Sequence, residues 1–199
     1  GLPMSRVHDF DMAAQLFARH QSIDEMTATD LQLEFKAVGL TIDKGMDRAA
    51  MGQRLKKWEV WKALKWQELL AECRRCNIVI SNDLTRKGND EGQWHAHSDR
   101  LLRKLLDNER LSMWERQGIP ARRIGNPDTV NRLVEQLERM QSMTNAELKG
   151  TYELNGLLVD NSMDRQDLVR HLKQVLEWEA LPLFELRRVG RERKLSNLV

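Results

Sequence analysis

The sequence contains few of the residues that interrupt helices or build sheets. Its 199 residues include only 4 prolines, 1 tyrosine and 4 phenylalanines, and no segment alternates apolar and polar residues over the length of a half-buried strand. Glu, Lys, Arg, Leu, Met and Gln are abundant instead, and these residues favour helix over strand. The sequence therefore predicts an all-α protein.

Long apolar runs and paired cysteines are also scarce. No run reaches the roughly 18 apolar residues that a membrane-spanning helix needs. Cys73 and Cys76 are three positions apart in a segment that reads as helical, where a disulfide between them would be strained. We therefore expect a reducing intracellular compartment. The chain begins at Gly1, and if a presequence has been removed there, the expected compartment is an organelle interior.

Neither a block of one charge nor a catalytic signature is present. The 32 Lys and Arg residues are balanced by 30 Asp and Glu residues, and both signs are spread along the chain. Proteins that follow a phosphate backbone usually concentrate basic residues on one surface. The sequence also has no nucleophile elbow and no Gly-rich phosphate loop. We expect a non-enzymatic protein with no cofactor and no small-molecule substrate.

An internal repeat organises the chain. Residues 26–69 align with residues 143–186 without a gap at an offset of 117, and 16 of the 44 aligned positions are identical. In the first copy Thr27 has the character of a helix N-cap, Gly39 that of a helix terminator, and Asp47 that of a second N-cap. The later copy repeats all three. Each copy is therefore predicted to be a helix, a loop and a second helix.

Two weaker copies follow the clear ones, with 66–116 as the second unit and the segment LFELRRVG opening a fourth that has one helix only. The second unit has an expanded loop at 79–97. The segment 126–142 reads as a connecting helix, and a short helix before the first copy has Met12, Leu16 and Phe17 as its expected inner face. The predicted domains are an N-terminal helical extension (1–25), a first pair of units (26–116), a linker with a connecting helix (117–142) and a second pair (143–199).

The first copy, MTATDLQLEFKAVGLTIDKGMDRAAMGQRL, resembles a SAP domain, a short helix-extended-loop-helix module. The residues that carry the resemblance are Asp30, Leu31, Gly39, Leu40, Lys44, Gly45, Met51 and Leu55, and in the later copy Glu147, Leu148, Gly156, Leu157, Asp167, Leu168 and Leu172. Since SAP domains commonly bind DNA, the resemblance implies Lys44, Arg48 and Arg54 as candidate phosphate contacts. The later copy has Asn161 in place of Lys44, and aspartates recur in both loops, where they would repel phosphate.

One group of residues has the composition of a zinc site. Cys73, Cys76, His95 and His97 offer two thiols and two imidazoles, which suit tetrahedral zinc. The repeat gives a simpler explanation for Cys73, because this residue falls at the position of Phe35, and a buried cysteine behaves as a small hydrophobic residue. We expect no metal, and we retain these four as candidate ligands.

Six tryptophans are many for a chain of this size. Trp61 and Trp178 occupy equivalent positions in the two copies, which indicates a structural role. Four others have no counterpart and are candidate interface anchors, with core packing as the alternative: Trp58, Trp66, Trp94 and Trp114.

These observations favour a helical scaffold or interaction subunit that docks on a larger protein assembly, which would be an organellar one if a presequence has been removed. The alternative is a SAP-type DNA- or RNA-binding protein, for which a nuclear location would be expected. The third hypothesis is a zinc-stabilised binding module.

Overall fold

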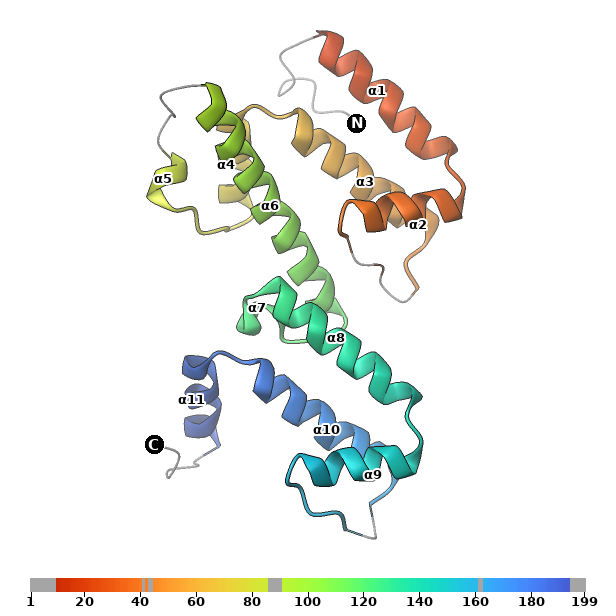
Figure 1. The fold of residues 1–199 in the computed structure, drawn as a ribbon. Helices are drawn as coiled ribbons and strands as arrows, with labels where there is room; N and C mark the ends of the chain where they lie inside the picture. Colours follow the sequence, from red (N-terminus) through yellow and green to blue (C-terminus); the bar gives the residue numbers. More distant parts are fainter. Residues whose placement is uncertain (1–9, 41, 43–44, 86–90, 161–162, 194–199) are drawn as a thin grey trace. The chain divides into compact units, whose positions relative to one another are not determined.

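The structure is a computed structural model that describes residues 10–40, 42, 45–85, 91–160 and 163–193. Within these ranges the chain forms eleven helices and no strand, which confirms the all-α prediction (Figure 1). No helix in the described part is both long enough and apolar enough to span a bilayer.

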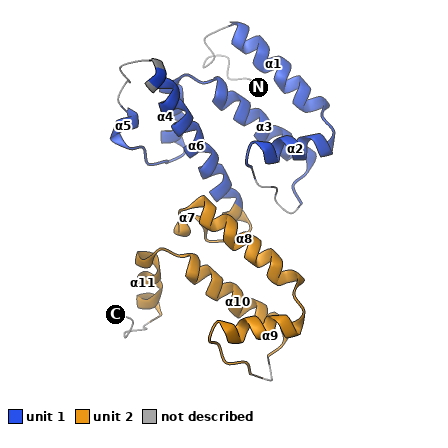
Figure 2. Ribbon diagram, viewed as in Figure 1, with its two compact units in different colours: residues 1–113 blue, residues 114–199 orange. Residues whose placement is uncertain are grey.

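The chain divides into two compact units, residues 1–113 and 114–199 (Figure 2). Helices of the first unit are α1 (Phe10–Glu25), α2 (Ala28–Ala37), α3 (Arg48–Ala63), α4 (Trp66–Arg75), α5 (Asn82–Thr85) and α6 (Glu91–Arg116), whose last turn crosses the boundary. Helices of the second unit are α7 (Ala121–Ile124), α8 (Pro127–Ser142), α9 (Asn145–Leu154), α10 (Arg165–Ala180) and α11 (Leu183–Glu192).

The structural repeat is longer than the repeat in the sequence. Each of α1, α2, α3 and α4 begins and ends 117 positions before α8, α9, α10 and α11, respectively. In each unit the first and second helices pack on the third, α1 and α2 on α3, and α8 and α9 on α10. The helices that the sequence analysis placed in an N-terminal extension and in a linker are therefore the equivalent first helices of two four-helix copies.

Sequence identity could not show this equivalence, because only 2 of the 16 aligned residues of α1 and α8 are the same. Burial shows it directly. Leu16 and Ile23 of α1 are buried, and so are Leu133 and Met140 at the same positions of α8. The predicted inner face of the first helix was wrong in part, since Met12 and Phe17 are exposed. The buried positions instead follow the spacing of three and four residues that lies along one side of a helix.

The predicted helix ends are confirmed. The Thr27 hydroxyl accepts a hydrogen bond from the backbone N–H of Asp30 at 3.2 Å, and Thr144 forms a complete capping box with Glu147. Asp47 caps α3, as its equivalent caps α10. The glycines at 39 and 156 have φ of 84° and 72°, a backbone conformation that residues other than glycine rarely adopt. These local signals set the helix bounds in both copies.

The expanded loop predicted at 79–97 was wrong over most of its length. Residues 82–85 form α5, and α6 already begins at Glu91, while residues 86–90 lie outside the described part. Residues 91–97 contain no proline, and they continue directly into the amphipathic segment that follows. The helix therefore extends toward the N-terminus beyond the apolar pattern that predicted it.

Helix α6 completes the core of the first unit. Leu101 and Leu105 are fully buried in one cluster with residues of α3, α4 and α5. Further along the helix, Leu106 and Met113 contribute to a second cluster with residues of α1, α2 and α3. One helix thus covers both α4 and the α2–α3 pair.

Candidate interaction surface

Two of the three predicted phosphate contacts are engaged inside the first unit. Arg48 donates to the backbone carbonyl oxygen of Met26 from Nε at 3.1 Å and from Nη2 at 2.8 Å, and it also donates to the carbonyl oxygen of Asp24. These carbonyls lie at the end of α1, where a helix leaves acceptors unsatisfied and favours a positive charge. Lys44 lies outside the described residues.

The second copy repeats this contact. Arg165, the equivalent of Arg48, donates from Nη2 to the carbonyl oxygen of Gln141 at 3.1 Å and from Nη1 to Asn145 Oδ1 at 3.0 Å. Gln141 and Asp24 are themselves equivalent residues, 117 positions apart. A contact that recurs in both copies indicates that this arginine joins the first helix to the third in each copy.

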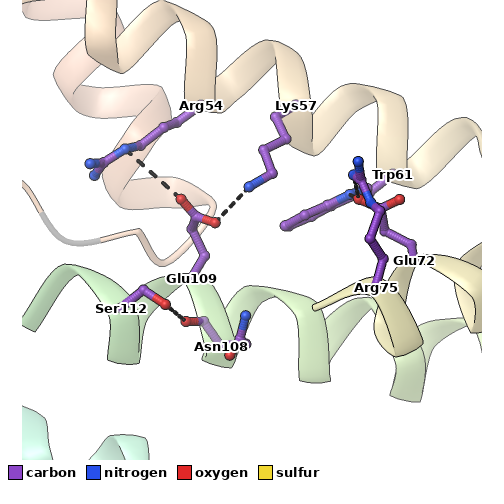
Figure 3. A network of polar contacts seen from close by, with 8 residues as sticks. All are labelled: Arg54, Lys57, Trp61, Glu72, Arg75, Asn108, Glu109 and Ser112. Carbon is purple, nitrogen blue, oxygen red and sulfur yellow. Dashed lines mark hydrogen bonds and ion pairs between the residues drawn. The ribbon is translucent and has the colours of Figure 1, made fainter. Parts of the chain in front are cut away.

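Arg54 belongs to a polar cluster between α3 and α6 (Figure 3). Its Nε lies 4.0 Å from Glu109 Oε1, and Lys57 Nζ lies 2.8 Å from Glu109 Oε2. Figure 3 shows both basic side chains directed at this single carboxylate. Because Glu109 is mostly buried, its two cationic partners help to fix α6 on α3.

The tryptophan common to both copies is buried only in the first. Trp61 is 4% exposed, its Nε1 donates to Glu72 Oε1 at 3.1 Å, and Lys57 Nζ lies 4.8 Å from the ring centroid (Figure 3). Glu72 is also buried, and it accepts a second hydrogen bond from Arg75. Trp178 is half-buried, with Arg193 over its ring at 4.8 Å. The same residue therefore meets two different environments.

The four candidate interface tryptophans do not form one surface. Trp114 is 1% exposed, so it is a core residue and presents no surface for a partner. Trp58 and Trp66 are half-buried against the cluster that Leu101 and Leu105 complete. Trp94, on α6, is 40% exposed, and it is the only one of the four tryptophans whose side chain is exposed.

The structure does not bring the candidate zinc ligands together. Within the described residues, no three His, Cys, Asp or Glu side chains are placed to hold a metal ion. Cys73 is fully buried, its Sγ donates to the carbonyl oxygen of Leu101 at 3.8 Å, and burial raises the pKa of its thiol to about 11. His95 and His97 lie on α6, exposed and half-buried. Cys73 is a core residue, as its alignment with Phe35 predicts.

Sequence analysis missed a group of exposed hydrophobic side chains. Across the described residues, eight large apolar side chains are more than half exposed: Phe10, Phe17, Leu33, Val79, Leu154, Leu158, Leu183 and Phe184. Leu186 adds to the last two on α11, where it is 39% exposed. The alignment of α11 with α4 could have shown that α11 has an apolar side. Helix α11 keeps a leucine, Leu186, at the position of Leu69, which is a core residue of the first unit.

Helix α11 is nevertheless held in a defined place. The corner before α4 has φ and ψ of −77° and 140° at Leu64, and the corner before α11 has −73° and 140° at Leu181. Glu185, which is 7% exposed, accepts from Arg123 Nε of α7 at 2.9 Å and pairs with Arg188 at 2.9 Å. The two corners thus have the same backbone geometry, and the apolar side of α11 is exposed in a fixed orientation.

Comparison with known proteins identified no homologue of this chain. No family model matches the chain, and neither the curated proteins nor the solved structures contain a significant match.

Proposed function

We propose that this chain is a non-enzymatic helical scaffold or interaction subunit that docks on a larger protein assembly. The observation that carries the proposal is the exposed apolar surface, which groups on a few elements. Leu183, Phe184 and Leu186 lie on α11, and Phe10 and Phe17 lie two turns apart on α1. Single exposed hydrophobic residues are ordinary, whereas groups of them on one element mark surfaces that a partner covers.

Nucleic-acid binding is the alternative function, and it rests on the resemblance to SAP domains. The contacts of Arg48 and Arg54 do not support it, because both guanidinium groups are directed at acceptors of this chain. A side chain that already completes a helix end or a buried carboxylate would have to leave that partner in order to meet phosphate. The scaffold function is therefore the preferred one.

The test is the size of the particle that contains the native chain. A gentle extract of the source cells, or of their organelles, is separated on a density gradient at physiological salt, with and without nuclease, and the chain is located with an antibody. The proposal predicts sedimentation well above that of a 23.3 kDa protein, with nuclease making no difference. Sedimentation as a free monomer would contradict it, and loss of the large particle after nuclease treatment would favour the nucleic-acid alternative.

A further inference from the structure

The two copies differ in what covers their fourth helix. In the first unit the side of α4 that contains Leu69 and Cys73 is closed by α6 through Leu101 and Leu105, which are four residues apart and so lie on one side of that helix. Trp61 and Trp66 belong to the same cluster. Helix α4 is therefore a core helix because α6 lies on it (Figure 1).

In the second unit the equivalent positions are exposed or half-buried. We define the open face as Trp178, Leu183, Leu186 and Gly190, which are equivalent to Trp61, Trp66, Leu69 and Cys73. Leu183 is 62% exposed and Leu186 is 39% exposed, whereas Leu69 is 1% exposed. A Cβ added at Gly190 would meet no described atom within 4 Å outside the backbone of its own helix. The open face thus keeps the apolar character of its counterpart, and no helix of the second unit lies against it among the described residues.

Two arginines beside the open face indicate which kind of partner could cover it. Arg187 stands at the position of the buried Leu70, and Arg191 lies one turn further along the same side of α11. Both side chains are exposed. A partner helix that covered Leu183 and Leu186 would therefore meet two guanidinium groups at the rim, and carboxylates are the groups that complement them.

The same charges argue against a second copy of this chain as the occupant. Pairing two α11 helices would bring the arginines of one copy against those of the other. Helix α6 of a second copy carries Arg100 and Lys104 on one flank of its buried leucines, and it already covers α4 of its own unit. Both arrangements place like charges together, so a different protein with an acidic helix fits better.

We propose that the open face of α11 binds an acidic amphipathic helix of a partner protein, laid on α11 as α6 is laid on α4. This inference rests on the proposed interaction function and specifies one of its docking sites. The partner helix presents two large apolar side chains four residues apart to Leu183 and Leu186, and carboxylates beside them to Arg187 and Arg191. This is the helix-in-groove mode, in which apolar anchors supply affinity and the charged rim selects the partner.

The probe is a peptide that copies residues 97–113 of this chain with the substitutions R100E and K104E, and the unaltered peptide is its control. Each peptide carries a fluorophore and is titrated with the full chain, with fluorescence anisotropy as the measurement. The acidic peptide should bind saturably, with a Kd on the order of tens of micromolar, as expected for a short helix on a small apolar patch. The unaltered peptide should bind at least about tenfold more weakly, because its basic residues meet the arginine rim.

Three variants of the full chain locate the site. L183E and L186E should each weaken binding of the acidic peptide at least about tenfold, since each buries a charge at the centre of the contact. The control is L33E, which places the same change at an exposed leucine of α2 and should leave binding unchanged. All three substituted positions are exposed, and circular dichroism should confirm that the variants keep their helix content.

Several outcomes would overturn the inference. The acidic peptide could fail to bind, or it could bind the L186E variant as well as it binds the parent chain. A dimer in sedimentation equilibrium that L186E abolishes would identify a second copy as the occupant. Failure of the inference is distinguishable from failure of the proposed function, because an L186E chain that still enters the large particle removes only this docking site. A native chain that sediments as a free monomer removes the function itself.

Discussion

The same leucine-to-alanine substitution should have different costs at two equivalent positions, one in each unit. Leu69 and Leu186 occupy equivalent positions of α4 and α11, and both are to be replaced by alanine. Leu69 is 1% exposed within the cluster that Leu101 and Leu105 close, so L69A removes buried methyl groups and leaves a cavity. Such changes cost about 2–5 kcal/mol of unfolding free energy, and about 3 kcal/mol is expected here.

The cost at the second position should be much smaller. Leu186 is already 39% exposed, so its truncation returns only part of an apolar side chain to water and leaves no enclosed cavity. Scaling the burial of a leucine side chain by the fraction that is covered gives about 1 kcal/mol for L186A. The two identical substitutions should therefore differ by about 2 kcal/mol, a gap that comes from α5 and α6, which close the cluster around Leu69.

Hydrogen–deuterium exchange across a urea series separates the two units, because peptides from α4 and from α11 report on different cores. L69A should lower the midpoint for α4 strongly and L186A should lower that for α11 slightly, each leaving the other unit unchanged. A loss above about 2 kcal/mol for L186A would mean that the face of α11 is covered in the isolated protein. That result would refute the reasoning.

Three further predictions follow from named contacts. R48A and R165A should each lower the unfolding free energy of their own unit by about 1 kcal/mol, measured by the same exchange series, because each arginine satisfies carbonyls at a helix end. Iodoacetamide should alkylate Cys76 in the native protein and Cys73 only after unfolding, as mass spectrometry can show, because burial raises the pKa of the Cys73 thiol to about 11. Burial lowers the pKa of His20 below its usual 6.5, so the unfolded chain takes up a proton at this residue more readily than the folded chain does. The first unit should therefore lose stability as the pH falls below 6.5, and H20L should remove that loss.

Each of these predictions has a result that contradicts it. If R48A weakened binding to duplex DNA and left stability unchanged, Arg48 would be a phosphate contact. Equal alkylation of the two cysteines in the native state would place α6 away from α4 in solution. For His20 the second unit is the control, since it has Leu137 at the same position and should show no such dependence on pH; an H20L chain with an unchanged pH profile would assign the effect to other groups.

Much of the local structure could be predicted from short patterns. Thr27, Asp47 and their equivalents begin helices where expected, and Gly39 and Gly156 end them, because caps and terminators act through neighbouring backbone atoms. The helix at 127–142 was also predicted, and Asn126 caps it as expected. Its role was not predicted, because α1 and α8 share a pattern of burial rather than a pattern of identical residues.

The surface was the hardest part to predict. Trp114 was a candidate anchor and is buried, whereas Leu183 and Leu186 are exposed although no prediction placed them on the surface. The apolar stripe of an amphipathic helix has the same sequence whether it faces a helix of its own chain or a surface. Arg48 and Arg54 present a related difficulty, since an arginine that caps a helix and one that binds phosphate look alike in sequence.

The sequence by itself determined the helical class, the starts of α2, α3, α8, α9 and α10, the glycine ends of α2 and α9, and the existence of a duplication, because these follow from propensity, capping and periodicity within short segments. Only the tertiary structure decided that the duplicated unit has four helices and that α6 covers α4. It also decided that α11 keeps an apolar face on which no helix of its own unit lies, among the described residues. These features depend on contacts between residues far apart in the sequence, and the sequence of a single helix does not determine which neighbouring helix will cover it.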